Sequence, residues 1–221
     1  MSSRRVLALA AAALAACGGD TIRTDNPPSG EKTLAPLGTG ARWTYRVTDP
    51  LRDAPFDKVV EVAGPQQIPE SSATAILVVD SEPTQEERAW LVKRNGLVLR
   101  AREEDWRAGA LVRKTTWTPE APKTLAADAP LGWTHRETVS ESEWHASDGL
   151  TAVKDQIYEF TVVGTNVQVT VPAGTFTCLK VTRVRLDKPG TDRTYWLAPD
   201  VGKVREEGER TEELVDYSPA P

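Results

Sequence analysis

The chain has very little of the two residue types that most often build metal sites and disulfide frameworks. Its 221 residues include two cysteines, Cys17 and Cys178, and two histidines, His135 and His145. No Cys-x-x-C or His-x₃-His spacing occurs, and an extended strand would hold the two histidines about 33 Å apart. So few cysteines also mean that the fold depends on a packed core rather than on disulfides. We expect no metal site and no cofactor.

Signatures of catalysis are missing as well. There is no Gly-x-Ser-x-Gly and no glycine-rich phosphate loop. Cys178 has no histidine near it in the sequence, and an isolated cysteine in a strand is usually a small buried hydrophobe. Three acidic runs are typical of solvated turns and strand faces: Glu103-Glu104-Asp105, Glu206-Glu207 and Glu212-Glu213. We therefore expect no catalytic residue. The alternative is an enzyme that uses two acidic residues as general acid and base, although no sequence pattern selects a particular pair.

Clusters of basic residues are absent. The full chain carries a formal net charge of −5, and removal of residues 1–16, which include Arg4 and Arg5, makes the balance more negative by two. An acidic protein without basic clusters is not expected to bind nucleic acid or to dock electrostatically on anionic lipid.

Long hydrophobic runs are absent too. The longest, Val6–Ala16, is too short for a membrane helix, which needs about 20 apolar residues. It follows Arg4 and Arg5 and ends in small residues at Cys17, as secretory signal peptides do. We predict a signal peptide over residues 1–16.

The four residues Leu14-Ala15-Ala16-Cys17 resemble the lipobox of bacterial lipoproteins. In that family the cysteine receives a diacylglyceryl group, the peptide is cut before it, and the new amine is usually acylated. The resemblance implies lipid attachment at Cys17 and stable membrane anchoring, because two or three acyl chains keep a protein on the membrane whereas a single chain binds only marginally. The alternative is an ordinary cleaved signal. Gly18, where inner-membrane lipoproteins often have Asp, implies an outer-membrane protein that faces the periplasm.

The rest of the chain divides into a tether, one domain and a short tail. Residues 17–37 follow the anchor with Gly, Pro and Ser and no periodicity, so they are expected to form a flexible tether with a reach of about 25 Å. Residues 38–217 are expected to form one β domain, and residues 218–221 a tail.

Strand patterns dominate the domain. Residues 42–48 alternate with period two, residues 73–79 form a continuous apolar run, and Asn95-Gly96 stands between two strand-like runs as a hairpin turn. Residues 119–130 show no strand pattern and are expected to be a long connection, while residues 157–171 are expected to form a hairpin turned near Gly164. The inward face is predicted to carry Trp43, Tyr45, Leu77, Val79, Leu179 and Val181.

No segment outside the signal has helical periodicity, which predicts an all-β fold with little or no helix. We expect a single large curved antiparallel sheet of eleven or more strands, as a half-barrel, an open barrel or a sandwich. The phrases at 170–176 and 195–204 are similar to phrases in uncharacterised exported bacterial lipoproteins. That resemblance implies a fold type like the half-barrels of the lipoprotein carriers, and it implies no activity.

Tryptophan is unusually frequent, with seven against three phenylalanines. Such residues suit half-buried sheet positions, so a core role is the plain interpretation. The alternative is that Trp43, Trp90, Trp117 and Trp133 line a concave face that binds a ligand. The sequence thus predicts a membrane-anchored envelope lipoprotein that binds a lipid-like ligand or a protein partner, with a structural envelope component as a further alternative.

Overall fold

The computed structural model describes residues 33–220, and this part of the chain forms strands without any α-helix. The signal peptide, Cys17, Gly18 and the tether up to residue 32 lie outside the described residues. No helix among the described residues could span a membrane. The strands are β1 (Arg42–Thr48), β2 (Phe56–Gln67), β3 (Thr74–Glu82), β4 (Gln85–Arg94), β5 (Leu97–Arg107), β6 (Ala110–Leu125), β7 (Thr134–His145), β8 (Thr151–Val171), β9 (Gly174–Arg185), β10 (Arg193–Ala198), β11 (Gly202–Glu207) and β12 (Thr211–Ser218).

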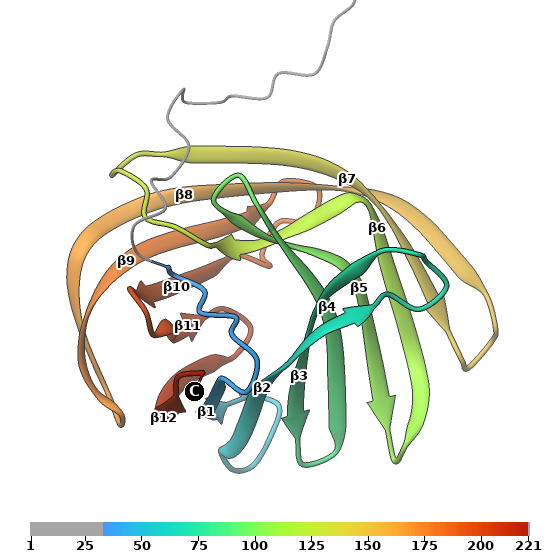
Figure 1. Ribbon diagram of the computed structural model, residues 1–221, viewed down its shortest axis with the longest axis horizontal. Helices are drawn as coiled ribbons and strands as arrows, with labels where there is room; N and C mark the ends of the chain where they lie inside the picture. The colour runs from blue at the N-terminus through green and yellow to red at the C-terminus, as the bar shows by residue number, and fades with distance from the viewer. Residues whose placement is uncertain (1–32, 221) are drawn as a thin grey trace, which may run out of the picture.

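The twelve strands form one antiparallel sheet that closes into a barrel. Each strand pairs with its neighbours in sequence, and β1 pairs with β12 to complete the ring (Figure 1). Closure removes the two free edges that an open sheet would expose to pairing with other chains. The all-β class and the single antiparallel sheet are confirmed, and the closed ring replaces the half-barrel implied by the carrier resemblance.

The turn at Asn95-Gly96 follows the prediction, because both residues adopt positive φ, 53° and 74°. The turn expected at Gly164 does not exist. Residues 151–171 are one long strand, β8, whose pairing with β9 shifts register around Gly164. A Cβ at this position would lie 2.9 Å from Cγ2 of Val167, so the glycine allows a crowded bulge within a strand.

The long connection expected over residues 119–130 is also wrong in its first half, because β6 continues to Leu125. Pairing between β6 and β7 ends at Thr118, opposite Ser140. Pro119 and Pro122 therefore lie where β6 has left β7, and the backbone donor that proline lacks is not needed on that side.

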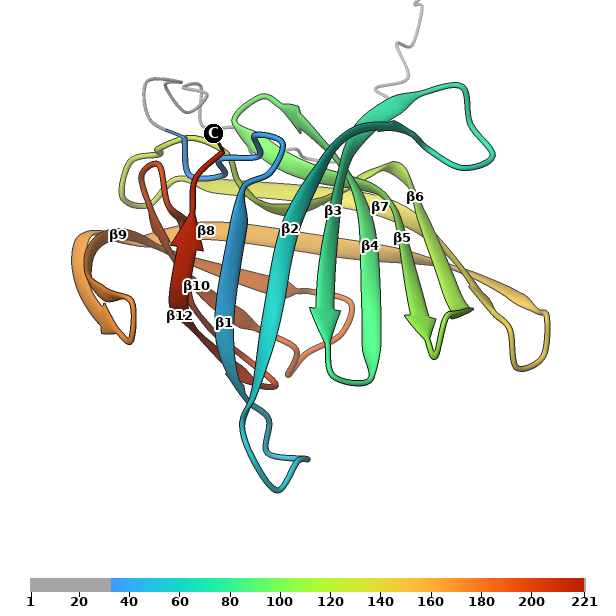
Figure 2. The ribbon, with the colours of Figure 1, turned by 60° about the horizontal axis from the view of Figure 1, so that its bottom comes forward.

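One end of the barrel is filled by residues 33–37, here called the plug segment. Its Thr33 forms a bridge with Ala127, and the Leu34 nitrogen donates to the Ala126 oxygen at 2.9 Å. Leu34 is 1% exposed, so these five residues belong to the packed domain, and the predicted tether does not include them. Figure 2 shows the plug segment at the upper end and the turns β3–β4 and β5–β6 at the opposite end.

The predicted inward face is correct for Trp43, Tyr45, Leu179 and Val181, all of which are buried. It is wrong on β3, where Val78 and Asp80 face the barrel interior instead. Leu77 and Val79 pack on the outer side of the sheet in a small cluster with Ala75, Trp90, Val92 and Ile68. The apolar run 73–79 supplies core residues on both faces, so its pattern does not mark the inward one.

Candidate ligand-binding cavity

The barrel contains a partly open cavity of about 450 Å³. Its wall near the plug segment is apolar and includes Leu34, Leu37, Trp43, Val60, Val78, Leu91, Val98 and Leu197. The opposite part reaches the turns β9–β10 and β11–β12 through Lys188, Thr191 and Glu209. A cavity with one apolar end and one charged end suits a ligand that has the same two halves.

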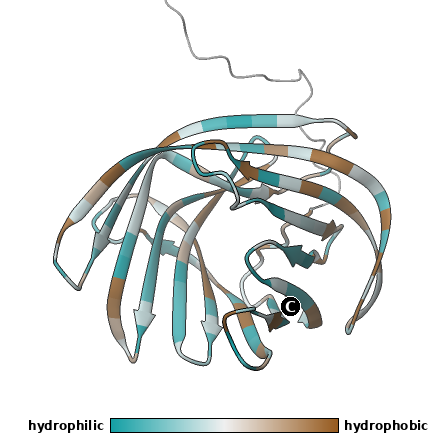
Figure 3. Cartoon of the chain, turned by 180° about the vertical axis from the view of Figure 1, so that it is seen from behind, coloured by the Kyte–Doolittle hydropathy of each residue, from teal (hydrophilic) through white to brown (hydrophobic). Residues whose placement is uncertain are grey.

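Charged side chains line the middle of the barrel. The expectation that the acidic runs are solvated is therefore wrong for their inward-facing members. Glu103, Glu206 and Glu212 are only 7%, 5% and 1% exposed. Strand alternation sends neighbouring residues to opposite faces, so Glu103 and Asp105 point inward in the first run, and one member points inward in each of the other two. Figure 3 shows hydrophilic and hydrophobic residues alternating along the strands.

Glu212 on β12 is the centre of one interior ion-pair network. Its carboxylate lies 2.6 Å from Nζ of Lys58, 2.6 Å from Nζ of Lys203 and 2.8 Å from Nη2 of Arg210. Burial alone would raise the pKa of Glu212, but the three cations outweigh burial and hold the pKa well below its ordinary value. Lys203 also lies 2.6 Å from Glu206. The network joins β2, β11 and β12 across the barrel wall.

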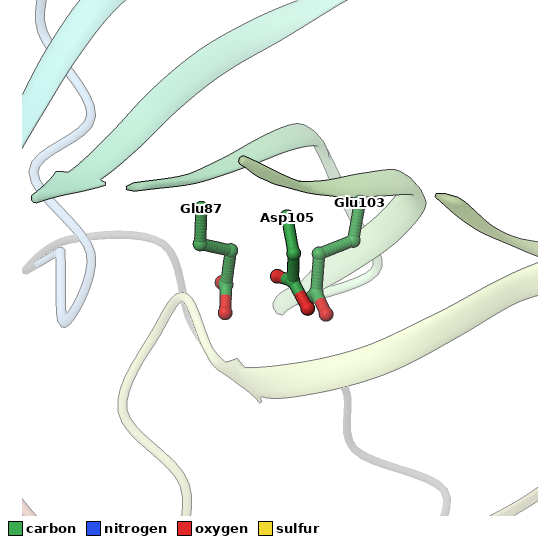
Figure 4. Close-up of side chains that lie close together, drawn as sticks. All are labelled: Glu87, Glu103 and Asp105. Carbon is green, nitrogen blue, oxygen red and sulfur yellow. The ribbon is translucent and has the colours of Figure 1, made fainter. Parts of the chain in front are cut away.

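A second cluster brings three carboxylates together on β4 and β5 (Figure 4). One oxygen from each of Glu87, Glu103 and Asp105 lies within 4.8 Å of the others, close enough to share a metal ion. Burial, followed by the charge of Glu103, raises the pKa of Glu87. These three are the residues in the described part of the chain that could hold a cation.

Cationic side chains already compensate that acidic cluster. Arg113 lies 2.6 Å from Asp105, Arg100 lies 2.8 Å from Glu103, and Nζ of Lys123 lies 3.8 Å from Glu87. With one cation beside each carboxylate, the charge is balanced by the protein itself. The cluster is therefore better explained as an internal salt-bridge network than as a cation site.

Arg183 on β9 differs from the other interior cations because no carboxylate of the described residues forms an ion pair with it. The residue is 9% exposed, and its Nε has no hydrogen-bond partner among the described residues. Its guanidinium lies 5.8 Å from the ring centres of both Tyr158 and Tyr195. Burial lowers the pKa of Arg183, and the charges of Arg193 and Arg100 lower it further.

All four tryptophans predicted to bind a ligand are buried, but only two line the cavity. Trp43 donates from Nε1 to the Val201 oxygen at 2.7 Å, and Trp117 donates to Glu141 at 2.9 Å. Trp90 lies on the outer side of β4 in the cluster with Leu77. Trp133 packs in the core and stacks on His135, with ring centres 5.9 Å apart. The structure thus does not bring the four together.

The remaining residues singled out by the sequence have structural partners. His135 hydrogen-bonds to Glu137 at 3.0 Å and His145 to Glu143 at 2.9 Å. Cys178 is buried, and burial raises the pKa of its thiol to about 11, which keeps the thiol protonated at neutral pH. His135, His145 and Cys178 do not line the cavity.

Sequence reasoning missed Arg183 and the plug segment. A signal for Arg183 was present, because Val181, Arg183 and Arg185 alternate with Thr182 and Val184 and so share a face with a core residue. For the plug segment no such signal exists, because Thr33–Leu37 has no periodicity, and what buries it is the shape of a barrel formed by later residues.

Comparisons with known proteins find fold likeness only. No protein-family model and no curated protein matches the chain. A protein from Bacteroides fragilis, described as exported and with a YmcC-like fold, aligns with a TM-score of 0.44 and 13% identity over 85% of this chain and 99% of its own. A protein from Parabacteroides distasonis, described as a lipoprotein, aligns with a TM-score of 0.43 and 12% identity over 85% and 99%. Similarity this distant transfers no function, so function rests on the cavity.

Proposed function

We propose that this chain is a lipid-anchored protein of the bacterial cell envelope that binds a small amphiphile inside its barrel and catalyses no reaction. The anchor part rests on the lipobox at Cys17, and Gly18 favours the outer membrane with the domain in the periplasm. Membrane attachment through acyl chains leaves the domain free to present its interior to a diffusing ligand.

The observation that carries the binding function is the interior cavity with its two unlike ends. An apolar body entering toward Leu34, Val98 and Leu197 removes hydrocarbon surface from water, worth about 25 cal/mol for each Å² covered. At the other end of the cavity, the charged side chains around Glu212 and Arg183 suit a polar head group. A plain hydrocarbon would make no favourable contact with these charged side chains, which favours an amphiphile over a purely apolar ligand.

A non-catalytic role agrees with the pairing of the interior carboxylates. General acid or base catalysis requires a group that is free to transfer a proton to the substrate. Asp105, Glu103 and Glu212 are each bound to an arginine or lysine within 2.8 Å. These three carboxylates are therefore engaged in ion pairs, whereas Asp80 and Glu87 lie farther from their cations, at 3.6 Å and 3.8 Å.

Fluorescence titration with laurate tests this function, since Trp43 and Trp117 report from the cavity wall. Thr115 is buried on that wall beside Trp117, whereas Thr116 faces the other side of the same strand. We expect Thr115→Phe to fill the cavity and weaken laurate binding at least about tenfold, which equals about 1.4 kcal/mol. Thr116→Phe should bind as the unmodified protein does.

Both variants are first checked for native sheet content by far-ultraviolet circular dichroism. If the unmodified protein produces no saturable change with laurate, or if the two variants bind equally, the ligand does not occupy the cavity and the proposed function is refuted.

A further inference from the structure

The geometry around Arg183 points to a specific subsite for an oxyanion, a carboxylate or a phosphate carried by the bound amphiphile. This inference rests on the proposed function, and it names the chemical group that the cavity selects. The oxyanion would take the place that acidic side chains take beside the other interior cations.

The first argument is the unpaired charge. Leaving a buried ionic group without a partner is costly, because the lost hydration is not replaced by an opposite charge. Arg183 is 9% exposed and lines the cavity, yet its Nε has no hydrogen-bond partner among the described residues. By contrast, Arg193 lies 2.7 Å from Glu206, and Arg185 lies 2.6 Å from Asp187. Among the described residues, Arg183 is the buried cavity cation without an ion-pair partner, whereas Lys188, which also has none, is exposed to solvent.

The second argument is the position of a like charge directly beside it. In the pairing of β9 with β10, Arg183 stands opposite Arg193. Cβ atoms of such pairs are about 5 Å apart, and like charges there repel. Glu206 compensates part of the Arg193 charge, and an anion bound beside Arg183 would reduce the repulsion that remains.

The third argument is the shape of the subsite. Tyr158 and Tyr195 each place a ring centre 5.8 Å from the Arg183 guanidinium, which restricts the orientation of that group. A guanidinium held in a fixed plane binds carboxylate and phosphate oxygens through two parallel hydrogen bonds. Arg100 on β5 also lines this cavity and lies 4.5 Å from the Trp117 ring centre.

The fourth argument is the local charge of the wall. Arg113, Arg185 and Arg210 line the cavity but are paired with Asp105, Asp187 and Glu82, which lie outside its lining. The wall as a whole is therefore close to balanced, and the positive charge that can attract an anion is local to Arg183. The apolar wall near the plug segment then receives the hydrocarbon part of the same molecule.

Four twelve-carbon probes test the subsite: laurate, dodecyl phosphate, the neutral 1-dodecanol and dodecyltrimethylammonium. For the unmodified protein we expect both anions to bind at least about tenfold more tightly than dodecanol, and the ammonium probe to bind most weakly. Laurate against dodecyl phosphate then decides whether a carboxylate or a phosphate is preferred.

The matched variants are Arg183→Met, which keeps the length of the side chain without the charge, and Arg42→Met on the exposed face of β1. We expect Arg183→Met to lose the preference for anions while it still binds dodecanol, and Arg42→Met to behave as the unmodified protein. In the absence of ligand, Arg183→Met should also unfold at a higher urea concentration, because it removes an uncompensated buried charge. A residue with a purely structural role would shift the urea midpoint in the opposite direction.

The outcomes separate this inference from the proposed function. If dodecanol and laurate bind equally to the unmodified protein, or if Arg183→Met keeps the preference for anions, the oxyanion subsite is refuted while binding in the barrel stands. If no probe binds, both are refuted.

Discussion

Replacing Glu212 tests whether the barrel is held together from the inside by ion pairs. The Glu212→Gln substitution keeps the size of the side chain but removes the charge that faces Lys58, Lys203 and Arg210 at 2.6–2.8 Å. Breaking a buried ion pair by removing one partner costs about 3–5 kcal/mol. The three cations keep other partners, for example Glu206 at 2.6 Å from Lys203, so we expect the lower end of that range.

The control lies at the next residue. Glu213 faces the other side of β12, its side chain is 35% exposed, and it pairs with Arg205 at 3.6 Å. An exposed pair of this kind contributes about 0–1 kcal/mol, so Glu213→Gln should be nearly silent.

Urea unfolding monitored by tryptophan fluorescence measures both variants. In a thermal scan of the same variant, a loss of about 3 kcal/mol should lower the melting temperature by roughly 6–12 °C for a domain of this size. Equal losses for the two variants, or a loss below about 1 kcal/mol for Glu212→Gln, would show that the interior network does not carry the stability assigned to it.

Three further predictions follow from the same structure. Leu179→Ala should cost about 2–5 kcal/mol, because Leu179 is 5% exposed in the core. Lys180→Ala should cost about 0.5 kcal/mol, because the contact it loses is that of its Nζ with the Trp196 ring at 5.1 Å. Equal losses of the two variants in urea melts would refute the register of β9. The charges of Lys203 and other cations outweigh burial and lower the pKa of Glu206 from 4.5 to about 2, so the stability it contributes is complete above pH 4.5 and is lost as the pH falls toward 2. Glu206→Gln should therefore flatten that part of the stability curve, and an unchanged acid dependence in the variant would contradict the shift. Cys17→Ser should release the protein from the membrane fraction; a variant that still sediments with membranes would refute the lipid anchor.

The sequence predicted the strands better than it predicted how they close. Local signals are sufficient for the turn at Asn95-Gly96 and for strand β1, because turn chemistry and period-two alternation act between neighbouring residues. Closure of the sheet depends on pairing between β1 and β12, whose residues are far apart in the chain. Two prolines and a glycine misled the interpretation of β6 and β8. The prolines lie where β6 no longer pairs with β7, and the glycine lies at a bulge in β8.

The candidate site was harder to predict than the fold. Alternation divides a strand into two faces without saying which one is inward, and the charged interior removes the usual cue that the inward face is apolar. On β3 the apolar Leu77 lies outside, while the acidic Asp80 lies inside. Of the four tryptophans singled out, Trp43 and Trp117 lie on the cavity wall, and the abundance of tryptophan gave no indication of Arg183.

The most direct test of ligand binding inside the barrel is to locate where a bound amphiphile makes contact. A fatty acid with a photoreactive diazirine is bound to the purified protein and activated by light, and the labelled residues are identified by mass spectrometry of the digested chain. The account predicts labelling on the cavity wall, at residues such as Tyr158, Tyr195 and Val98, that disappears in the presence of excess laurate. Labelling confined to the outer side of the sheet, for example at Trp90, would contradict it.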